Sequence, residues 1–292
     1  MNRTPSKLKA ALWMAGFLSL MLLMAISGRE AARELKVFQI MELRSTLGLL
    51  MLCPVIYFAD GFTMLRTSRL PMHATRALLH YAGQYGWFVA LTLIPLAQVV
   101  SIEFTMPIWT AILAASFLGE RVTVWKIAAI ALGLIGVFVI VRPSTGEINP
   151  GQLIALVAAV TLGATVVMMK SLTRTETALA IVFWMMAIQA LVGALPTLYV
   201  WVWPSPHVWG WVIAVAFGGT FSHFCLARAM LYADATTVVP MDFLRVPLTA
   251  AAGWLIYGER LDLFTVLGAT LILAGNLLNL KPPTPRPAPI EA

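Results

Sequence analysis

Long apolar stretches without a charged residue run through this chain and limit the folds open to it. In a lipid bilayer every backbone N–H and C=O group needs a partner within the protein, and a helix provides that partner within one segment. About 20 apolar residues are enough to cross the hydrocarbon core. The sequence therefore predicts an all-α membrane protein with ten transmembrane helices, whose charge-free windows lie near residues 10–27, 45–59, 77–94, 104–118, 127–141, 151–169, 180–202, 208–227, 246–257 and 263–280.

The composition and the placement of charges agree with a membrane location. Of the 292 residues, 60% are hydrophobic and only 11% are charged, whereas a soluble domain has about 25% charged residues. The net charge of +7 could suit nucleic acid, but Lys and Arg gather on one side of the predicted spans, as the positive-inside rule describes. This pattern predicts a multi-pass protein with both termini in the cytoplasm, in contact with lipid and not with nucleic acid.

One segment of the chain occurs twice. EFTMPIWTAILAASFLGER at residues 103–121 returns as DFLRVPLTAAAGWLIYGER at residues 242–260, with a carboxylate first and Gly-Glu-Arg last in both. The correspondence continues around both copies, so that Arg29 matches Arg174 and Gln84 matches His223. We expect one five-helix repeat at residues 8–142, a second at 150–281, and a disordered Pro-rich tail at 282–292.

Five helices in each repeat is an odd number, so the second repeat must enter the membrane from the side opposite to the first. Such inverted repeats, related by a pseudo-two-fold axis in the membrane plane, are typical of secondary transporters. The acids that open the two copies, Glu103 and Asp242, should then lie across that axis near the middle of the membrane.

These features resemble the EamA-type members of the drug/metabolite transporter superfamily. VFQIMELRSTLGLLML resembles the family's second helix with its early arginine, and TSRLPMHATRALLHYAGQYGWFVAL resembles the region leading into helix three of bacterial members, including S-adenosylmethionine uptake carriers. Glu42 departs from the family's pattern, which has an apolar or aromatic residue there. The resemblance implies a secondary carrier of the bacterial inner membrane, which works by alternating access around a cavity lined by helices 1, 3, 4, 6, 8 and 9.

The two mid-membrane acids are the strongest candidate site residues. Glu103 and Asp242 could bind an amine or take up a proton, because carboxylates inside a membrane are costly and tend to line functional paths. Asp242 could instead form a structural ion pair with Arg245, one helical turn away. Glu103 has no arginine beside it, and it is therefore expected to be the freer of the two.

Further polar and aromatic residues could line the same cavity. Arg44 could bind a substrate carboxylate through its planar guanidinium, or could anchor helix packing by pairing with Glu103 or Glu42. His80 and Gln84 share a helix face, and His223 holds the place of Gln84 in the second repeat; each could equally be a hydrogen-bonded core residue. Trp109 could form an aromatic wall, although aromatic residues more commonly pack or anchor at the interface.

Two prolines follow the acids, and two Gly-Glu-Arg turns end the copies. Pro107 and Pro247 are expected to bend their helices for gating or cavity shaping, since proline frees a carbonyl one turn back; simple packing is the alternative. Glu120–Arg121 and Glu259–Arg260 are interpreted as helix caps outside the binding site.

We expect no metal and no cofactor, because zinc-ligand spacings, nucleotide loops and hydrolase motifs are absent from the sequence.

The sequence therefore favours a secondary transporter, and not an enzyme, that moves a small organic metabolite. Acids and arginines together suit a zwitterion, so an amino acid or an amino-acid-like compound is expected, with export as the favoured direction and protons as a candidate coupling ion. Uptake of S-adenosylmethionine, a vitamin or a nucleoside-like compound stays open. So do two functions of a different class: a polytopic membrane enzyme acting on a lipid-linked substrate, and a membrane scaffold. A monomer carries both halves, so a monomer or weak homodimer is expected.

Overall fold

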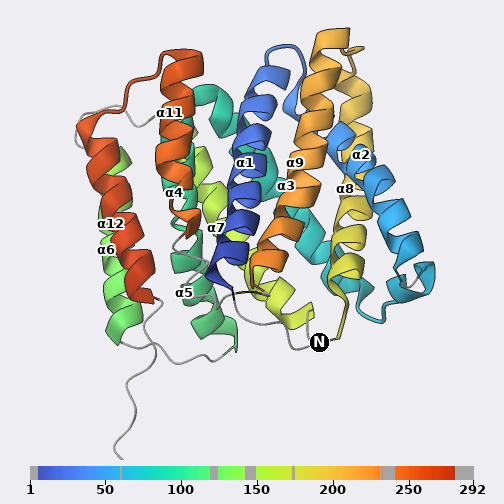
Figure 1. Ribbon diagram of the computed structural model, residues 1–292, viewed down its shortest axis with the longest axis horizontal. Helices are drawn as coiled ribbons and strands as arrows, with labels where there is room; N and C mark the ends of the chain where they lie inside the picture. Colours follow the sequence, from blue (N-terminus) through green and yellow to red (C-terminus); the bar gives the residue numbers. More distant parts are fainter. Residues whose placement is uncertain are drawn as a thin grey trace, which may run out of the picture.

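The computed structural model describes residues 6–59, 61–118, 124–141, 149–172, 175–230, 232 and 241–279, and its regular structure there is helical (Figure 1). The expected tail at 282–292 and the Glu120–Arg121 turn lie outside the described residues. The helices are α1 (Lys7–Ala31), α2 (Val37–Phe58), α3 (Leu70–Leu93), α4 (Leu96–Glu103), α5 (Met106–Leu118), α6 (Val124–Val141), α7 (Pro150–Leu172), α8 (Ala178–Val200), α9 (Pro206–Met230), α11 (Arg245–Tyr257) and α12 (Leu263–Asn279), with a short 3₁₀ helix, η1 (Phe62–Leu65), between α2 and α3.

The predicted all-α class is confirmed for these residues. Six helical segments are long and apolar enough to cross a membrane, judged by length and composition: 8–31, 37–58, 96–113, 150–169, 179–200 and 206–226. α6 and α12 each contain a shorter apolar helix. The prediction of ten transmembrane helices therefore stays a prediction for the remaining segments.

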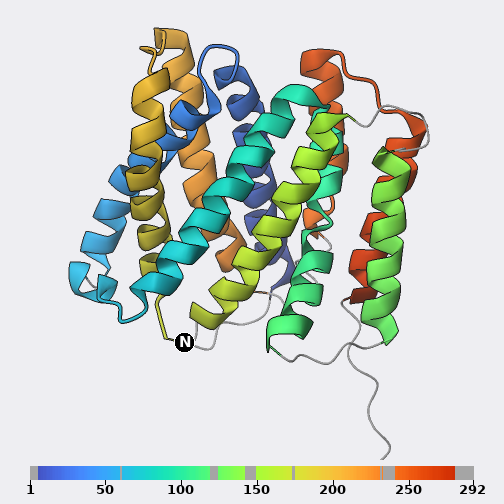
Figure 2. The same ribbon diagram turned by 180° about the vertical axis from the view of Figure 1, so that it is seen from behind.

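The helices form one bundle in which the two halves of the sequence are interleaved (Figures 1 and 2). The most extensive contacts are α1 with α9, α6 with α12, α3 with α7 and α2 with α8, and each of these pairs joins a helix before residue 142 to one after residue 149. The repeat makes α7 the counterpart of α1 and α9 the counterpart of α3. The contacts α1–α9 and α7–α3 are therefore the same contact seen twice, as a pseudo-two-fold arrangement requires.

α6 and α12 pack against each other through glycines on one edge of the bundle. A Cβ atom at Gly136 would lie 2.6 Å from the Gly268 carbonyl oxygen, and a Cβ at Gly268 would lie 2.5 Å from the Gly136 carbonyl oxygen. Side chains would force these backbones apart, so the small residues permit the close approach that stabilises helix pairs in membranes.

The helix that carries Glu103 is broken immediately after it. α4 ends at Glu103, Phe104 and Thr105 form a turn, and α5 begins at Met106. Asn276 on α12 donates a hydrogen bond of 2.8 Å to the Phe104 carbonyl oxygen, which satisfies a backbone group left open by the break.

Pro107 and Pro247 each lie in the first helical turn of a helix that begins directly after a non-helical pair of residues. Pro107 is the second residue of α5, and Pro247 is the third residue of α11. Backbone N–H groups in a first helical turn have no partner within the helix, so proline costs no hydrogen bond there. Sequence reasoning expected these prolines to bend continuous helices, whereas they begin new helices after the chain has already turned.

Candidate functional site

Three charged side chains meet at the two helix breaks. Arg245 Nη1 lies 2.8 Å from Glu103 Oε1, and its Nε lies 3.3 Å from Asp242 Oδ1. The ring centre of Phe104 is 4.8 Å from the Arg245 guanidinium carbon, which adds a cation–π contact. Arg245 is only 5% exposed, so one buried cation is shared by two carboxylates, one from each repeat.

Glu103 is the more fully bonded of the two acids. Its Oε1 is bonded to Arg245, and its Oε2 accepts a hydrogen bond of 2.8 Å from Trp87 Nε1 on α3. The Asp242 side chain has longer contacts with Arg245 and is 23% exposed, against 11% for the Glu103 side chain. The sequence favoured Glu103 as the freer acid because its own helix has no arginine, but Arg245 reaches it from α11, in the other repeat.

Arg44 on α2 forms a second charged centre without an acid. It is 1% exposed, and its Nη1 donates a hydrogen bond of 2.7 Å to Gln84 Oε1 on α3. Its Nε has no hydrogen-bond partner among the described residues, and a Cβ atom at Gly219 on α9 would lie 2.7 Å from that nitrogen. The pairings with Glu103 or Glu42 that the sequence allowed are not formed: Glu103 binds Arg245, and Thr46 Oγ1 donates a 3.0 Å hydrogen bond to Glu42.

α3 connects the two charged centres. Gln84, which binds Arg44, and Trp87, which binds Glu103, are three residues apart on this helix, or about 4.5 Å along its axis. A helix places residues at this spacing on neighbouring positions of one face. A buried cation and an acid-rich cluster are therefore held close together by a single element.

Two other candidate residues, His80 and Trp109, have polar contacts with neighbouring side chains. His80 Nδ1 lies 3.0 Å from Gln189 Nε2 on α8, and Trp109 Nε1 donates a 3.1 Å hydrogen bond to Thr105 Oγ1 within the helix break. The side chain of His223, on α9, lies outside the described residues. Within the described part of the chain, no three His, Cys, Asp or Glu side chains gather as the ligands of a metal ion would.

Sequence reasoning missed Trp87 and Asn276 as members of the site. Trp87 lies in an apolar helix, and its indole N–H needs an acceptor when the side chain is buried, which could have indicated its role. Asn276 is a polar residue in an apolar segment, and it could have been recognised by the need for a hydrogen-bonding partner inside lipid.

Glu259 joins three elements at the upper end of the bundle in Figure 1. Its Oε1 pairs with Arg29 at the end of α1, and its Oε2 accepts a 3.0 Å hydrogen bond from the Leu96 N–H that begins α4. The Arg29 guanidinium also lies 4.3 Å from the ring centre of Tyr257. The second Gly-Glu-Arg turn, interpreted from sequence as a simple cap, therefore ties α1, α4 and α11 together.

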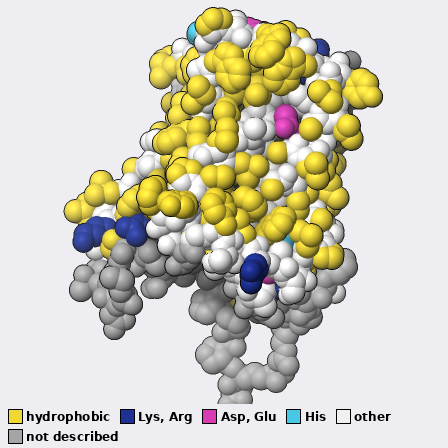
Figure 3. Space-filling model, turned by 90° about the vertical axis from the view of Figure 1, so that its right-hand side faces the viewer, with side chains coloured by type: hydrophobic (Ala, Val, Ile, Leu, Met, Phe, Trp, Pro, Cys, Tyr) yellow, Lys and Arg dark blue, Asp and Glu magenta, His cyan; other side chains and the backbone are white. Residues whose placement is uncertain are grey.

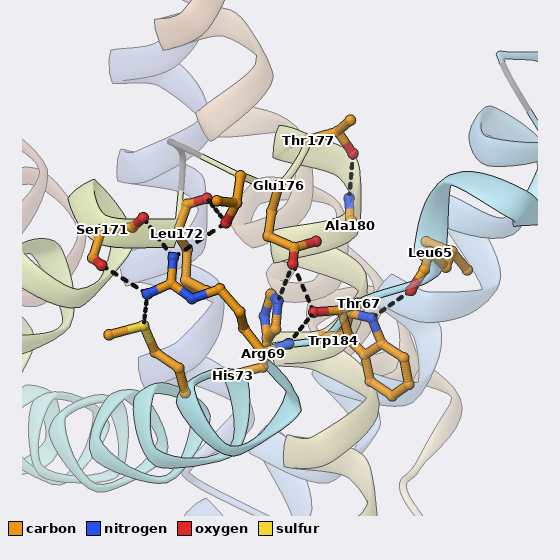
Figure 4. Close-up of polar contacts among 12 residues, drawn as sticks. Leu65, Thr67, Arg69, His73, Ser171, Leu172, Glu176, Thr177, Ala180 and Trp184 are labelled. Carbon is orange, nitrogen blue, oxygen red and sulfur yellow. Dashed lines mark hydrogen bonds and ion pairs between the residues drawn. The ribbon is translucent and has the colours of Figure 1, made fainter.

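A separate polar cluster (Figure 4) joins two connections at the end of the bundle where α3 begins and α7 ends. Arg69, which precedes α3, donates hydrogen bonds of 2.9 Å to both the carbonyl oxygen and the hydroxyl of Ser171 on α7. Glu176 accepts a 2.6 Å hydrogen bond from Thr67, and it lies 4.0 Å from His73 Nε2. The chain segment between α2 and α3 is thereby fixed to the segment between α7 and α8.

Comparison with known proteins identifies the family. The model of the EamA-like transporter family matches residues 8–142 and 149–281. The chain belongs to this family. Since the family and its characterised members are transporters, this EamA-like protein is a transporter of small molecules and not an enzyme.

Several named proteins are similar to this EamA-like transporter. The S-adenosylmethionine uptake transporter of Rickettsia prowazekii is 28% identical over 253 residues, which cover 86% of this chain and 85% of that protein. The riboflavin transporter of Rhizobium johnstonii is 30% identical over 76% of this chain and 74% of its own length. The pseudopaline exporter CntI of Pseudomonas aeruginosa is 26% identical over 84% of this chain and 86% of its own length.

A solved structure shares the fold of this EamA-like transporter. That structure carries the description "Crystal structure of protein", and it aligns with this chain with a TM-score of 0.64 and 21% sequence identity. The alignment covers 94% of this chain and 97% of the other chain. The agreement over nearly the full length of both chains supports the arrangement of helices described above. Together with the apolar helices, the bacterial relatives indicate a multi-pass protein of the bacterial inner membrane.

Proposed function

We propose that this transporter moves a small zwitterionic metabolite with an α-amino-acid group across the inner membrane by alternating access. Ten transmembrane helices form two inverted repeats, at residues 8–142 and 150–281, and both termini lie in the cytoplasm. The lower end of the bundle in Figure 1 then faces the cytoplasm and the upper end faces the periplasm. One monomer contains the whole pathway.

The observation that carries this proposal is the separation of charge at the site. Arg44 is a buried cation whose one hydrogen-bond partner in the described structure is the neutral Gln84. One turn along α3, the cluster around Arg245 contains two acids and one cation. A ligand carboxylate suits the planar fork of Arg44, and a ligand ammonium suits Asp242, the more exposed acid.

The relatives help to choose among zwitterionic substrates. S-adenosylmethionine, the substrate named for the Rickettsia prowazekii relative, has an amino-acid end with a carboxylate and an ammonium group, whereas riboflavin has neither. We therefore favour S-adenosylmethionine or an amino acid over a vitamin. Because the relatives named for S-adenosylmethionine are uptake carriers, we propose uptake in place of the export that the sequence alone favoured.

Replacing the central acids tests this assignment. In proteoliposomes that exchange radiolabelled S-adenosylmethionine or methionine, we expect Asp242→Asn to raise the concentration for half-maximal exchange about 10- to 100-fold, since a lost charge-assisted contact costs roughly 1.5–3 kcal/mol. Glu103→Gln should lower the rate, because it also weakens the hold on Arg245. Glu30→Gln, which alters an ion pair with Arg33 at the bundle's upper end, serves as the control. The assignment fails if both central variants exchange as the wild type does.

We infer that the Glu259 contacts with Arg29 and Leu96 close the periplasmic end of the pathway, and removing the carboxylate charge of Glu259 tests this. Glu259→Gln weakens the contacts with Arg29 and the start of α4, so it should favour the outward-open state. In a variant without native cysteines, Leu96→Cys is buried beneath this closure and should react slowly with an impermeant maleimide added outside whole cells. We expect labelling of Leu96→Cys to be several-fold faster when Glu259→Gln is added. Equal labelling rates with and without Glu259→Gln would remove Glu259 from the gate.

A further inference from the structure

Glu42 is a membrane carboxylate that the central site does not use. It lies on α2, five residues after the helix begins, or about 7.5 Å from that end. Its Oε1 accepts a hydrogen bond of 3.0 Å from Thr46, and its Oε2 is buried with no hydrogen-bond partner among the described residues. An unpartnered carboxylate oxygen at this depth is costly, and such groups are functional candidates by default.

The open oxygen of Glu42 faces a phenol and the backbone of the other repeat. A Cβ atom at Gly193 on α8 would lie 2.6 Å from Glu42 Oε2 and 3.1 Å from the Tyr81 hydroxyl on α3. The buried Tyr81 hydroxyl also has no hydrogen-bond partner in the described structure. Two groups that could share one hydrogen thus approach the same backbone position.

The surroundings of Glu42 contain no cation to neutralise it among the described residues. On α3, the titratable groups on its side are Tyr81 and Tyr85, and the Tyr85 ring stacks on Phe38 with 4.4 Å between centres. α8 has no charged residue, and its Tyr199 is exposed. On α9, His207 accepts a hydrogen bond from Trp211 at the upper end, and Arg228, in the last turn, lies against the rings of Trp13 and Phe224. Arg44 on α2 is bonded to Gln84.

The outer side of this region is apolar. Figure 3 looks onto the side of the bundle formed by α2 and α8, where hydrophobic side chains cover much of the described surface. α2 has Glu42 as its one acidic residue, and the side chain is half-buried. In such a medium, a neutral carboxylic acid is far less costly than a carboxylate.

The contact at Gly193 favours a proton over larger cations on this side of Glu42. A Cβ atom at Gly193 would lie 2.6 Å from Glu42 Oε2, so an ammonium or sulfonium group could approach from the α8 backbone only if the side chain moved. A bound proton needs no added volume, and the resulting acid O–H can donate to the Tyr81 hydroxyl.

We propose that Glu42 is the proton-binding residue that couples transport to a proton gradient, with Tyr81 as its hydrogen-bond partner. A proton from the periplasm binds to a Glu42 oxygen and is released to the cytoplasm after the halves rock; no other bond forms or breaks. Glu42 and Tyr81 belong to the first repeat and Gly193 to the second, so rocking changes the surroundings of the acid. Proton affinity must differ between the two states for coupling to occur.

This inference rests on the proposed function, and the test separates the two. Proteoliposomes receive radiolabelled S-adenosylmethionine or methionine under two conditions: exchange against internal substrate without a gradient, and net accumulation driven by a pH gradient, acid outside. We expect wild-type protein to do both. Glu42→Gln should keep exchange within about two-fold of the wild type and lose at least ten-fold in gradient-driven accumulation. Tyr81→Phe should show a smaller loss of the same kind.

A spectroscopic measurement follows the proton itself. Infrared difference spectra of the purified protein are recorded between acid and alkaline pH. The wild type and Glu30→Gln should show a carbonyl band from protonated Glu42, and Glu42→Gln should lack that band. A wild type that exchanges neither compound would refute the proposed function. The proton site alone would be overturned if the pH gradient drove accumulation equally well in the wild type and in Glu42→Gln, and if both proteins showed the same carboxylic acid band in the infrared.

Discussion

Arg245→Met is expected to destabilise the protein by about 3–5 kcal/mol and to abolish transport. The substitution removes the cation between Glu103 and Asp242 and leaves two carboxylates near each other in a poorly solvated site. Breaking a buried ion pair by removing one partner typically costs this much, because the remaining charge is uncompensated. Thermal unfolding in detergent and exchange in proteoliposomes measure the two effects.

Compensating substitutions provide the control for Arg245. Arg245→Met combined with Glu103→Gln and Asp242→Asn removes the uncompensated charges, so most of the lost thermal stability should return while transport stays absent. Arg245→Lys should retain part of the stability, since its ammonium can replace the charge but not the planar fork that reaches both acids. A stable Arg245→Met protein with normal exchange would contradict the shared-cation geometry.

Arg44→Met is expected to have the opposite effect on stability. Arg44 is 1% exposed and hydrogen-bonded to a neutral amide, so the wild type carries the cost of burying its charge without an acid to offset it. Methionine fills a similar volume without that cost. We expect an unchanged or higher unfolding temperature, together with a fall of about 100-fold in substrate affinity, equivalent to roughly 2.7 kcal/mol.

The comparison of the two arginines distinguishes a binding group from a structural one. Arg44→Lys should keep stability and recover only part of the affinity, because a lysine ammonium cannot bind a carboxylate in two places at once. If Arg44→Met instead unfolds as readily as Arg245→Met, Arg44 is a packing anchor and the substrate carboxylate must bind elsewhere.

Much of the fold follows from local patterns in the sequence. Apolar windows of helical length predict the helices, and the duplicated segment predicts that the chain contains two related halves. The ion pair between Asp242 and Arg245 was also within reach as an alternative, because residues three apart in a helix are neighbours.

The parts that could not be predicted depend on contacts between distant segments. Glu103 and Arg245 come from different repeats, and no spacing along the chain indicates that they meet. Glu259 had a clear local interpretation as a cap, yet its partners Arg29 and Leu96 lie far away in sequence. Arg44 was a candidate from its helix position, but its bond to Gln84 depends on how α2 and α3 cross.

The interleaving of the two halves has a consequence for biosynthesis. α1 and α3 obtain their most extensive contacts from α9 and α7, so the first half enters the membrane before its partners exist. At about 5–20 residues per second, the ribosome needs roughly 7–30 s to reach Arg245 after it has made Glu103. During that interval the acid has Trp87 but no cation, which makes the half-synthesised chain a natural client for membrane chaperones.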